Sequence, residues 1–398
     1  MERAPAGLTL RRAGDEDARG LAALWNHAFP GERSAEERIR DLEAGSVYGG
    51  LETAWVAEGD GGRRAGAFRI YDLELHLRGR PFRTMGLAAV AVEPEWRRRG
   101  VGRWMCREAL RLGREEGAVL ALLYPYRVDF YARLGFTSAG ELHRYRFHPE
   151  ELPTFPGREA VVRADPAEVE ELVARLYAQA TRRRNGLLTR PREAWRHLYA
   201  PNATVLLHQE AAGEPSAYAV VHPGPGPVET GPALHVRELL ALEMTGYRAL
   251  LGWISAQRGA WRHVVYDALP GEGFHRILGH PRLPGTGTVR DLWFQSAVLL
   301  RGPMLRILNL EALLTGTAQN QGDAVLPVLD SEVPENAGVW TLGEGEAVRA
   351  RKEAGEGGVP IRVLTDLLVS GTLPGGPRPA EEWEPALGLE DFQTLDTF

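Results

Sequence analysis

The stretch that decides the fold is VAVEPEWRRRGVG, residues 90–102. It begins at the end of a run over 85–92 that is apolar on both faces, as a central strand is. Three arginines and two glycines follow, and an amphipathic helix is predicted over 101–116 from its apolar repeat. A buried strand, a basic glycine turn and a helix therefore follow one another directly.

The turn Arg97-x-x-Gly100-x-Gly102 has the composition of a diphosphate-binding site. A helix N-terminus offers unpaired N–H groups and the positive end of a dipole. Glycine lets a backbone approach a ligand closely, and Arg97, Arg98 and Arg99 supply the compensating charge. A solvated basic helix start is the alternative, but the coincidence of strand, charge, spacing and helix favours the binding site.

This turn is the signature of the GNAT acetyltransferase superfamily, which the chain resembles at 97–102. The resemblance implies acetyl-CoA as co-substrate, with the preceding strand offering backbone groups to its pantetheine arm. The cofactor-binding residues that we expect are Val90, Ala91, Val92, Arg97, Arg98, Arg99, Gly100, Val101, Gly102, Arg103, Tyr126 and Arg127.

The chain of 398 residues is too long for one ordinary core. A segment with two prolines and a glycine, 152–157, suggests a boundary, and the strand and helix pattern of the first part then repeats between 160 and 266. The strand-to-helix junction of the second copy, Glu243-Met244-Thr245-Gly246-Tyr247, has no basic glycine turn. We interpret it as a degenerate copy that has lost its phosphate loop.

From about residue 289 the pattern changes. We expect an amphipathic helix over 303–314, short strands at 324–329, 339–342 and 347–350, and a helix over 361–369. Two GNAT-like halves, a third domain and a terminal Phe resemble the Eis-type (enhanced intracellular survival) acetyltransferases. The resemblance implies an α/β (α+β) fold: a catalytic domain over 1–150, a degenerate GNAT-like domain over 151–287 and a sterol-carrier-protein-like domain over 288–398. It also implies a homo-oligomer, a hexamer.

Two residues are candidates for handling protons. Tyr131 lies in the segment 130–136, which matches the family element that carries the general acid. A phenol with a reference pKa of about 10 is protonated at neutral pH and can donate to a thiolate. Phe398 offers its α-carboxylate, which in the family serves as the base and has a reference pKa of about 3.5. The alternatives are a core tyrosine and a frayed terminus.

The acceptor side departs from the family pattern at Tyr126-Arg127, where family members have small or acidic residues. The function that we expect is acetyl transfer to a primary amine: an aminoglycoside-like or polyamine-like compound, or a lysine side chain. Candidates for binding this substrate, each compatible with a structural role, are Trp25, Phe29, Asp291 and Asp396.

Composition narrows the remaining possibilities. Cys106 is the one cysteine and lies in an apolar stripe, so we expect core packing and no disulfide. The net charge of −6 argues against nucleic acid as the main partner, and no metal site is expected. No long apolar run or secretory signal is visible, so we expect a cytoplasmic protein without a membrane partner. A non-catalytic CoA- or lipid-binding module and a longer-chain acyltransferase are the rival functions.

Overall fold

The computed structural model describes residues 7–31, 33–199, 202–209, 214–226, 231–283, 294–317, 324–343, 346–350, 357–370, 392 and 395. The chain forms two compact units. Unit 1 is built mainly from Met1–Ala139 and Pro303–Phe392, and unit 2 mainly from Gly140–Gly302. Unit 1 is therefore discontinuous, because unit 2 lies between two of its segments in the sequence. Within the described ranges, no helix is long and apolar enough to cross a membrane.

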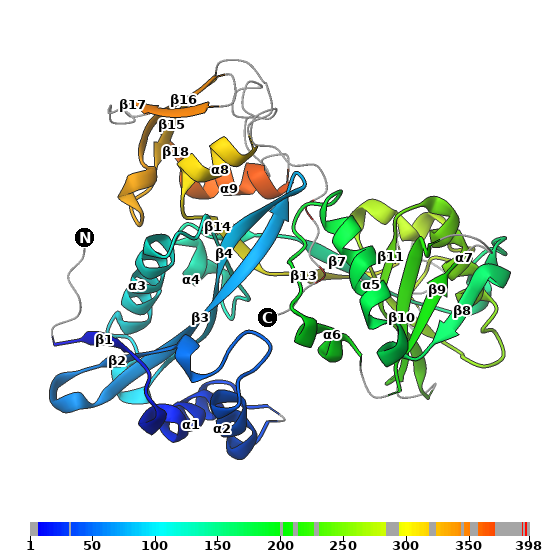
Figure 1. Ribbon diagram of the computed structural model, residues 1–398, viewed down its shortest axis with the longest axis horizontal. Helices are drawn as coiled ribbons and strands as arrows, with labels where there is room; N and C mark the ends of the chain where they lie inside the picture. Colours follow the sequence, from blue (N-terminus) through cyan, green and yellow to red (C-terminus); the bar gives the residue numbers. More distant parts are fainter. Residues whose placement is uncertain are drawn as a thin grey trace. The chain divides into compact units, whose positions relative to one another are not determined.

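Unit 1 contains a seven-stranded sheet in the order β1-β2-β3-β4-β5-β14-β6 (Figure 1). Its strands are β1 (Thr9–Arg12), β2 (Ala54–Glu58), β3 (Arg64–Leu77), β4 (Arg80–Val92), β5 (Leu120–Leu123), β6 (Thr137–Ser138) and β14 (Met304–Ile307). The first four are antiparallel neighbours, β5 runs parallel to β4, and β14 is antiparallel to β5 and β6. The mixed sheet expected from the sequence is confirmed.

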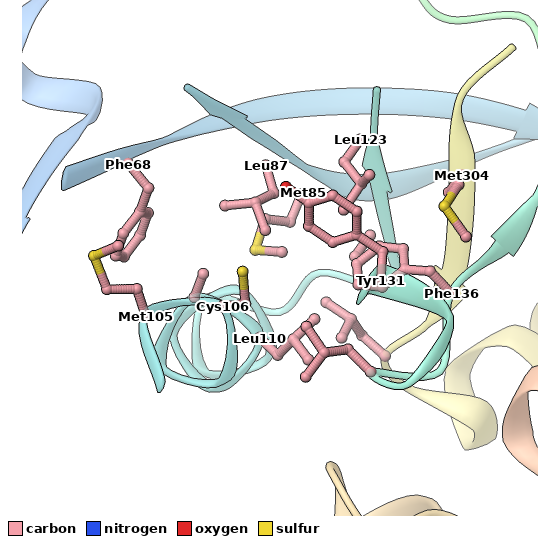
Figure 2. Close-up of a cluster of buried hydrophobic side chains, with 14 of the residues drawn as sticks. Phe68, Met85, Leu87, Met105, Cys106, Leu110, Leu123, Tyr131, Phe136 and Met304 are labelled. Atoms are coloured by element: carbon pink, nitrogen blue, oxygen red, sulfur yellow. The ribbon is translucent and has the colours of Figure 1, made fainter. Parts of the chain in front are cut away.

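Helices cover both faces of this sheet. On one face α1 (Ala18–Ala28) and α2 (Ala35–Glu43) share a core with Val56 and Ala67. On the other face α3 (Val101–Glu115) and α4 (Val128–Ala132) share a core with Ala57 and Phe68 (Figure 2). Neighbouring residues of one strand thus enter opposite cores, as the period of two requires. The predicted helix after the glycine turn is confirmed as α3.

Unit 2 repeats this plan in a sheet of order β13-β7-β12-β11-β10-β9-β8. Its elements are β7 (Glu141–Phe147), β8 (Val161–Ala164), α5 (Pro166–Thr181), α6 (Arg192–Leu198), β9 (Thr204–His208), β10 (Ala217–Gly224), β11 (Ala233–Ala241), α7 (Met244–Ser255), β12 (Val264–Ala268) and β13 (Val298–Arg301). β11 and β12 are parallel and joined through α7, as β4 and β5 are through α3. The predicted duplication is confirmed.

The later segments of unit 1 form a small sheet of order β17-β16-β15-β18 with two helices (Figure 1). They are α8 (Leu310–Thr317), β15 (Ala324–Leu329), β16 (Gly338–Gly343), β17 (Glu346–Ala350), β18 (Val359–Pro360) and α9 (Ile361–Ser370). The strands and the last helix predicted for this part are confirmed.

The helix predicted over 303–314 is wrong in its first half. Residues 304–307 form β14, which lies between β5 and β6 with all four residues buried. Three of its four residues are apolar, and this short segment runs on into Leu308 and Leu310, so periodicity alone cannot distinguish it from the start of a buried helix. Helix α8 begins only at Leu310.

The predicted domain boundaries also differ from the structure. We expected the first domain to run to 150, but β7 at 141–147 pairs with β12 in the sheet of unit 2. We expected the third domain to begin at 288, but β13 belongs to unit 2 and β14 to the first sheet. The prolines and glycine of 152–157 interrupt a connection inside unit 2, because such residues mark turns as readily as domain boundaries.

Candidate active site

Strand β4 carries a bulge beside the predicted ligand site. Its pairing with β3 changes register between Ala67 and Arg69, and Ala89 has a φ of 52°. A left-handed conformation costs an L-residue about 1–2 kcal/mol, so the surroundings must hold this bulge in place. The parallel ladder between β4 and β5 covers Thr84–Gly86. Beyond it, the edge of β4 at 90–92 has no β5 partner in the described structure.

Trp25 holds the bulge from α1. Its Nε1–H donates a hydrogen bond to the carbonyl oxygen of Ala89 at 2.7 Å. The side chain is buried at 3% exposure in the core beneath α1 and α2. Trp25, which we expected to bind the acceptor substrate, is thus buried in the structure and anchors the bulge of β4.

The turn after β4 has the backbone geometry of an anion site. A 3-10 turn at Pro94–Trp96 leads into it, Arg98 has a φ of 61° and Gly100 a φ of 81°. Left-handed residues in a turn direct successive N–H groups to one side, which makes a concavity suited to anions. No side chain caps α3, so the first N–H groups of that helix remain available to a ligand.

The arginines of this region divide into two sets. Arg97, Arg98 and Arg99 are exposed, with Arg97 Nε donating to the carbonyl of Val92 at 3.1 Å and Arg99 lying over the ring of Trp96. Arg103, which we also expected to bind the cofactor, forms an ion pair of 3.2 Å with Glu332. The charges of the turn itself are therefore placed for a phosphate, and Arg103 is already paired.

Tyr131 lies on α4, close to this turn. A Cβ built on Gly102 would lie 3.5 Å from Val92 and 3.9 Å from Phe130, so the starts of α3 and α4 meet the end of β4. The ring of Tyr131 packs edge-on against Phe130, Tyr126 and Phe136, with centroids 5.0, 6.0 and 6.1 Å away. Figure 2 shows the side chain extending toward the strands, with its hydroxyl as the one oxygen in the apolar cluster.

Tyr131 is a buried residue whose hydroxyl has no hydrogen-bond partner among the described residues. Tyr131 is 4% exposed, and within the described residues its hydroxyl makes no hydrogen bond. Removal from water raises the pKa of the phenol well above its ordinary value. The group therefore stays protonated throughout the neutral range and has its proton free for a ligand, which suits the predicted role of an acid.

A carboxylate also lies near Tyr131, that of Asp129 in the first turn of α4. Arg127 and Asp129 form an exposed ion pair of 2.6 Å. Hydrogen bonding from Arg127 lowers the pKa of Asp129, so its carboxylate is a weaker proton acceptor than an ordinary aspartate. Tyr126 is 66% exposed, and its ring extends the aromatic surface beside Tyr131. Tyr126 and Arg127, which we expected to bind the cofactor, therefore lie on the surface, with Arg127 paired to Asp129.

The other acceptor-side predictions fall in different places. Phe29 follows the last residue of α1 and is 37% exposed, so it remains a candidate surface residue. Asp291, Asp396 and Phe398 lie outside the described residues. Of the neighbouring tail, Phe392 is buried and Leu395 is half-buried against the core of α5.

Sequence reasoning missed Arg69, which holds the loop before β2. Its side chain is 8% exposed and donates to Thr53 Oγ1 at 2.8 Å and to the carbonyls of Gly49 and Gly50 at 2.7 and 2.9 Å. The signal was an arginine inside the apolar stretch 65–71 of β3, where a charge is costly unless it is hydrogen-bonded.

Cys106 belongs to the α3 core, as predicted. It is fully buried, and burial raises the pKa of its thiol to about 12. Such a thiol is not a nucleophile at neutral pH. Among the described residues, no group of three or more His, Cys, Asp or Glu side chains is placed to hold a metal ion.

Two family models match the chain, over residues 9–139 and 186–307, and each describes an acetyltransferase (GNAT) domain. The N-acetyltransferases Eis of Mycobacterium bovis and Mycobacterium tuberculosis are 28% identical over 331 residues, covering 78% of this chain and 76% of each relative. This chain belongs to the Eis-type GNAT acetyltransferases.

Solved structures support the same fold. A GCN5-related N-acetyltransferase from Anabaena variabilis has a TM-score of 0.80 at 18% identity and covers 98% of this chain and 100% of its own. Eis1 from Mycobacterium abscessus has a TM-score of 0.74 at 17% identity, with the same coverage. The acetyltransferase activity of the family rules out a purely non-catalytic binding module.

The start of α7 in the second GNAT domain differs from the start of α3 in the first. In the second, the N-cap of α7 is Glu243, which places a negative charge where a phosphate would lie. Beside it Glu272 accepts hydrogen bonds from Tyr247 at 2.9 Å and Tyr266 at 2.7 Å. These side chains satisfy one another, so the second domain presents a closed polar cluster in place of a binding turn.

Proposed function

We propose that this acetyltransferase moves an acetyl group from acetyl-CoA to a primary amine, with Tyr131 as general acid and the Phe398 carboxylate as general base. The observation that carries the proposal is Tyr131, a residue that is 4% exposed and whose hydroxyl makes no hydrogen bond within the described residues, on a helix close to the arginine turn. Exposed arginines, helix N–H groups and a left-handed Gly100 fit the diphosphate of coenzyme A.

The binding residues of unit 1 would orient the thioester. The turn at 97–102 holds the diphosphate, and the free edge of β4 at 90–92 offers backbone groups to the pantetheine amides. The bulge at Ala89 bends β4 away from β5, so that a ligand rather than a strand can occupy that edge. A pantetheine arm that runs from the turn along β4 would bring the thioester carbonyl toward Tyr131.

Direct transfer makes one C–N bond and breaks one C–S bond. The amine attacks as its free base, and its surplus proton leaves to the general base. Tyr131 donates a proton or a hydrogen bond to the departing thiolate. A thiol has a reference pKa of about 8.5, below that of the buried phenol, so complete transfer from Tyr131 is uphill. The tyrosine must therefore be reprotonated after each transfer. The proton that the amine has passed to the general base can serve for this.

The terminal carboxylate is the base that the family resemblance favours. Asp129, the acid near Tyr131, is exposed and paired with Arg127, and its pKa is lowered by that hydrogen bond. Of the tail, the described residues Phe392 and Leu395 are buried and half-buried. Asp291 and Asp396 are proposed to attract a cationic acceptor.

The name of the relatives, N-acetyltransferase, supports an amine nitrogen as the acceptor. An aminoglycoside-like or polyamine-like amine, or a lysine side chain, supplies the required nucleophile. The same resemblance supports a sterol-carrier-protein-like fold for the last domain and a hexamer.

Substitution of the acid tests the proposal. Tyr131→Phe removes one oxygen from a packed ring, so the fold should persist while kcat falls about 10²–10⁴-fold, the usual contribution of a positioned acid. Tyr199→Phe is the matched control, because it removes the same atom from a ring of unit 2 whose buried hydroxyl also has no hydrogen-bond partner among the described residues. Coenzyme A release is measured with acetyl-CoA and a panel of amines between pH 6 and 10.

The pH dependence gives a second reading of the same experiment. Burial raises the pKa of Tyr131 above its ordinary value, so the acid remains protonated up to pH 10 and wild-type kcat should show no decline there. Equal kcat for Tyr131→Phe and wild type would assign the tyrosine to the core alone.

A further inference from the structure

A buried ion pair lies behind the turn that follows Tyr131. Arg306 on β14 donates from Nη2 to both carboxylate oxygens of Asp330 at 2.8 Å. The two side chains are 0% and 1% exposed. A pair removed from water to this degree pays a desolvation penalty that a well-packed apolar pair would avoid. Its presence therefore calls for an explanation beyond stability.

Asp330 is fixed from several directions. Oδ1 accepts hydrogen bonds from the backbone N–H groups of Glu332 at 3.1 Å and Val333 at 3.0 Å. Oδ2 accepts one from the side-chain amide of Asn336 at 3.1 Å. The carboxylate is consequently a rigid anchor, and Arg306, bound to both of its oxygens, has one orientation.

The other end of the guanidinium reaches the active-site turn. Nη1 of Arg306 donates to the carbonyl oxygen of Leu134. Gly135 has a φ of 87°, and a Cβ at that position would overlap with Nη1 of Arg306. The glycine therefore serves two needs at once, a left-handed turn and the close approach of an arginine.

This turn continues directly into Tyr131. The backbone N–H groups of Leu134 and Phe136 both donate to the carbonyl oxygen of Tyr131, at 2.9 and 3.2 Å. Phe136 also packs edge-on against the Tyr131 ring, with centroids 6.1 Å apart. A shift of Leu134 would therefore move both the backbone and the ring neighbour of the proposed acid.

We propose that Arg306, held by Asp330, is a positioning residue for Tyr131: it fixes the turn 133–136 and thereby the direction of the Tyr131 hydroxyl. The inference rests on the proposed function, in which that hydroxyl acts on the leaving sulfur. The Nε–H of Arg306 has no hydrogen-bond partner within the described residues. The hydrogen bonds of this guanidinium therefore go to Asp330 and Leu134.

Arg306→Lys is the test, because lysine keeps the charge beside Asp330 but cannot bind Asp330 and Leu134 at once. We expect kcat to fall about 10–100-fold, the scale of a displacement of about 1 Å at a reacting group. KM for acetyl-CoA should stay near its wild-type value. Arg190→Lys is the matched control, since Arg190 and Glu238 form a similarly buried pair of 2.6 Å in unit 2.

A double-mutant cycle separates positioning from general damage. In the Tyr131→Phe background, Arg306→Lys should cause no further loss of kcat, because the atom that it positions is gone. If Arg306→Lys does not fold, Asp330→Asn is measured in the same cycle, since asparagine keeps the shape and removes the charge.

The outcomes distinguish the two proposals. An unchanged kcat, or the same fold-loss in both backgrounds, overturns the positioning role. Loss of kcat in Arg190→Lys equal to that in Arg306→Lys overturns it as well. Full activity of Tyr131→Phe itself overturns the proposed acid, whatever Arg306→Lys does.

Discussion

Replacing Trp25 with phenylalanine tests whether α1 holds the bulge that opens β4 to a ligand. The substitution keeps an aromatic ring in the core and removes the Nε1–H that donates to Ala89 O at 2.7 Å. Ala89 would then have no donor to retain its φ of 52°. We expect the strand to relax toward an ordinary extended conformation.

Two terms of opposite sign determine the stability of this variant. Loss of the donor to the half-buried carbonyl of Ala89 costs at most about 1–3 kcal/mol, the range for a fully buried group. Relaxation of Ala89 from the left-handed region recovers about 1–2 kcal/mol. The net loss is about 1 kcal/mol, which corresponds to a decrease in Tm of about 2–4 °C for a unit of this size.

Ligand binding should suffer more than stability. Acetyl-CoA would have to restore the bulge on binding. The strain of about 1–2 kcal/mol would then weaken the free energy of binding by the same amount. This raises Kd by about 5–30-fold. Calorimetric titration with acetyl-CoA measures the change, and thermal unfolding of the same preparation measures stability.

Trp55→Phe provides the matched control. Trp55 stacks on Phe68 in the neighbouring strands with centroids 6.5 Å apart, and within the described structure its indole N–H makes no hydrogen bond. This variant should bind acetyl-CoA as the wild type does. If Trp25→Phe also binds with wild-type affinity, the bulge does not depend on Trp25 and our reasoning about β4 is wrong.

The remaining predictions concern the turn and the terminus. Arg98→Ala/Arg99→Ala should weaken acetyl-CoA binding in calorimetry by at least 10-fold, since each charge-assisted contact with a phosphate contributes about 1.5–3 kcal/mol; unchanged affinity would exclude the turn from the site. Deletion of Phe398, or a few residues added after it, should abolish most amine acetylation while acetyl-CoA binding and Tm stay near wild type. A C-terminally extended enzyme as fast as the native one would make Asp129 the leading base.

The features that the sequence predicts well are local ones. The apolar run, the arginines, Gly100 and the stripe of α3 are contiguous, so their pattern reports the strand, turn and helix directly. The second copy is recognisable for the same reason, because its elements recur in the same order without the basic turn. Tyr131 was found in the same way, because the segment 130–136 matches a short family motif.

The features that sequence reasoning missed depend on contacts between distant residues. Arg306 meets Leu134, 172 positions away, and Trp25 meets Ala89, 64 positions away. No local period records such a pair. For β14 the local signal was misleading, because Leu305 and Ile307 of this buried strand continue the apolar spacing of α8 that follows it.

These distant contacts explain why the active-site unit is discontinuous. Without β14, β5 would be an edge strand with four buried apolar residues, Leu120–Leu123, and unpaired backbone groups on one side. Without Arg306, which β14 carries, the turn after Tyr131 would lose the donor to Leu134. One short strand from beyond unit 2 therefore completes the sheet and also supplies the arginine that we propose orients the acid. The first 150 residues contain the arginine turn and the tyrosine, but the strand that supports β5 and the turn after Tyr131 comes from a segment more than 150 residues later.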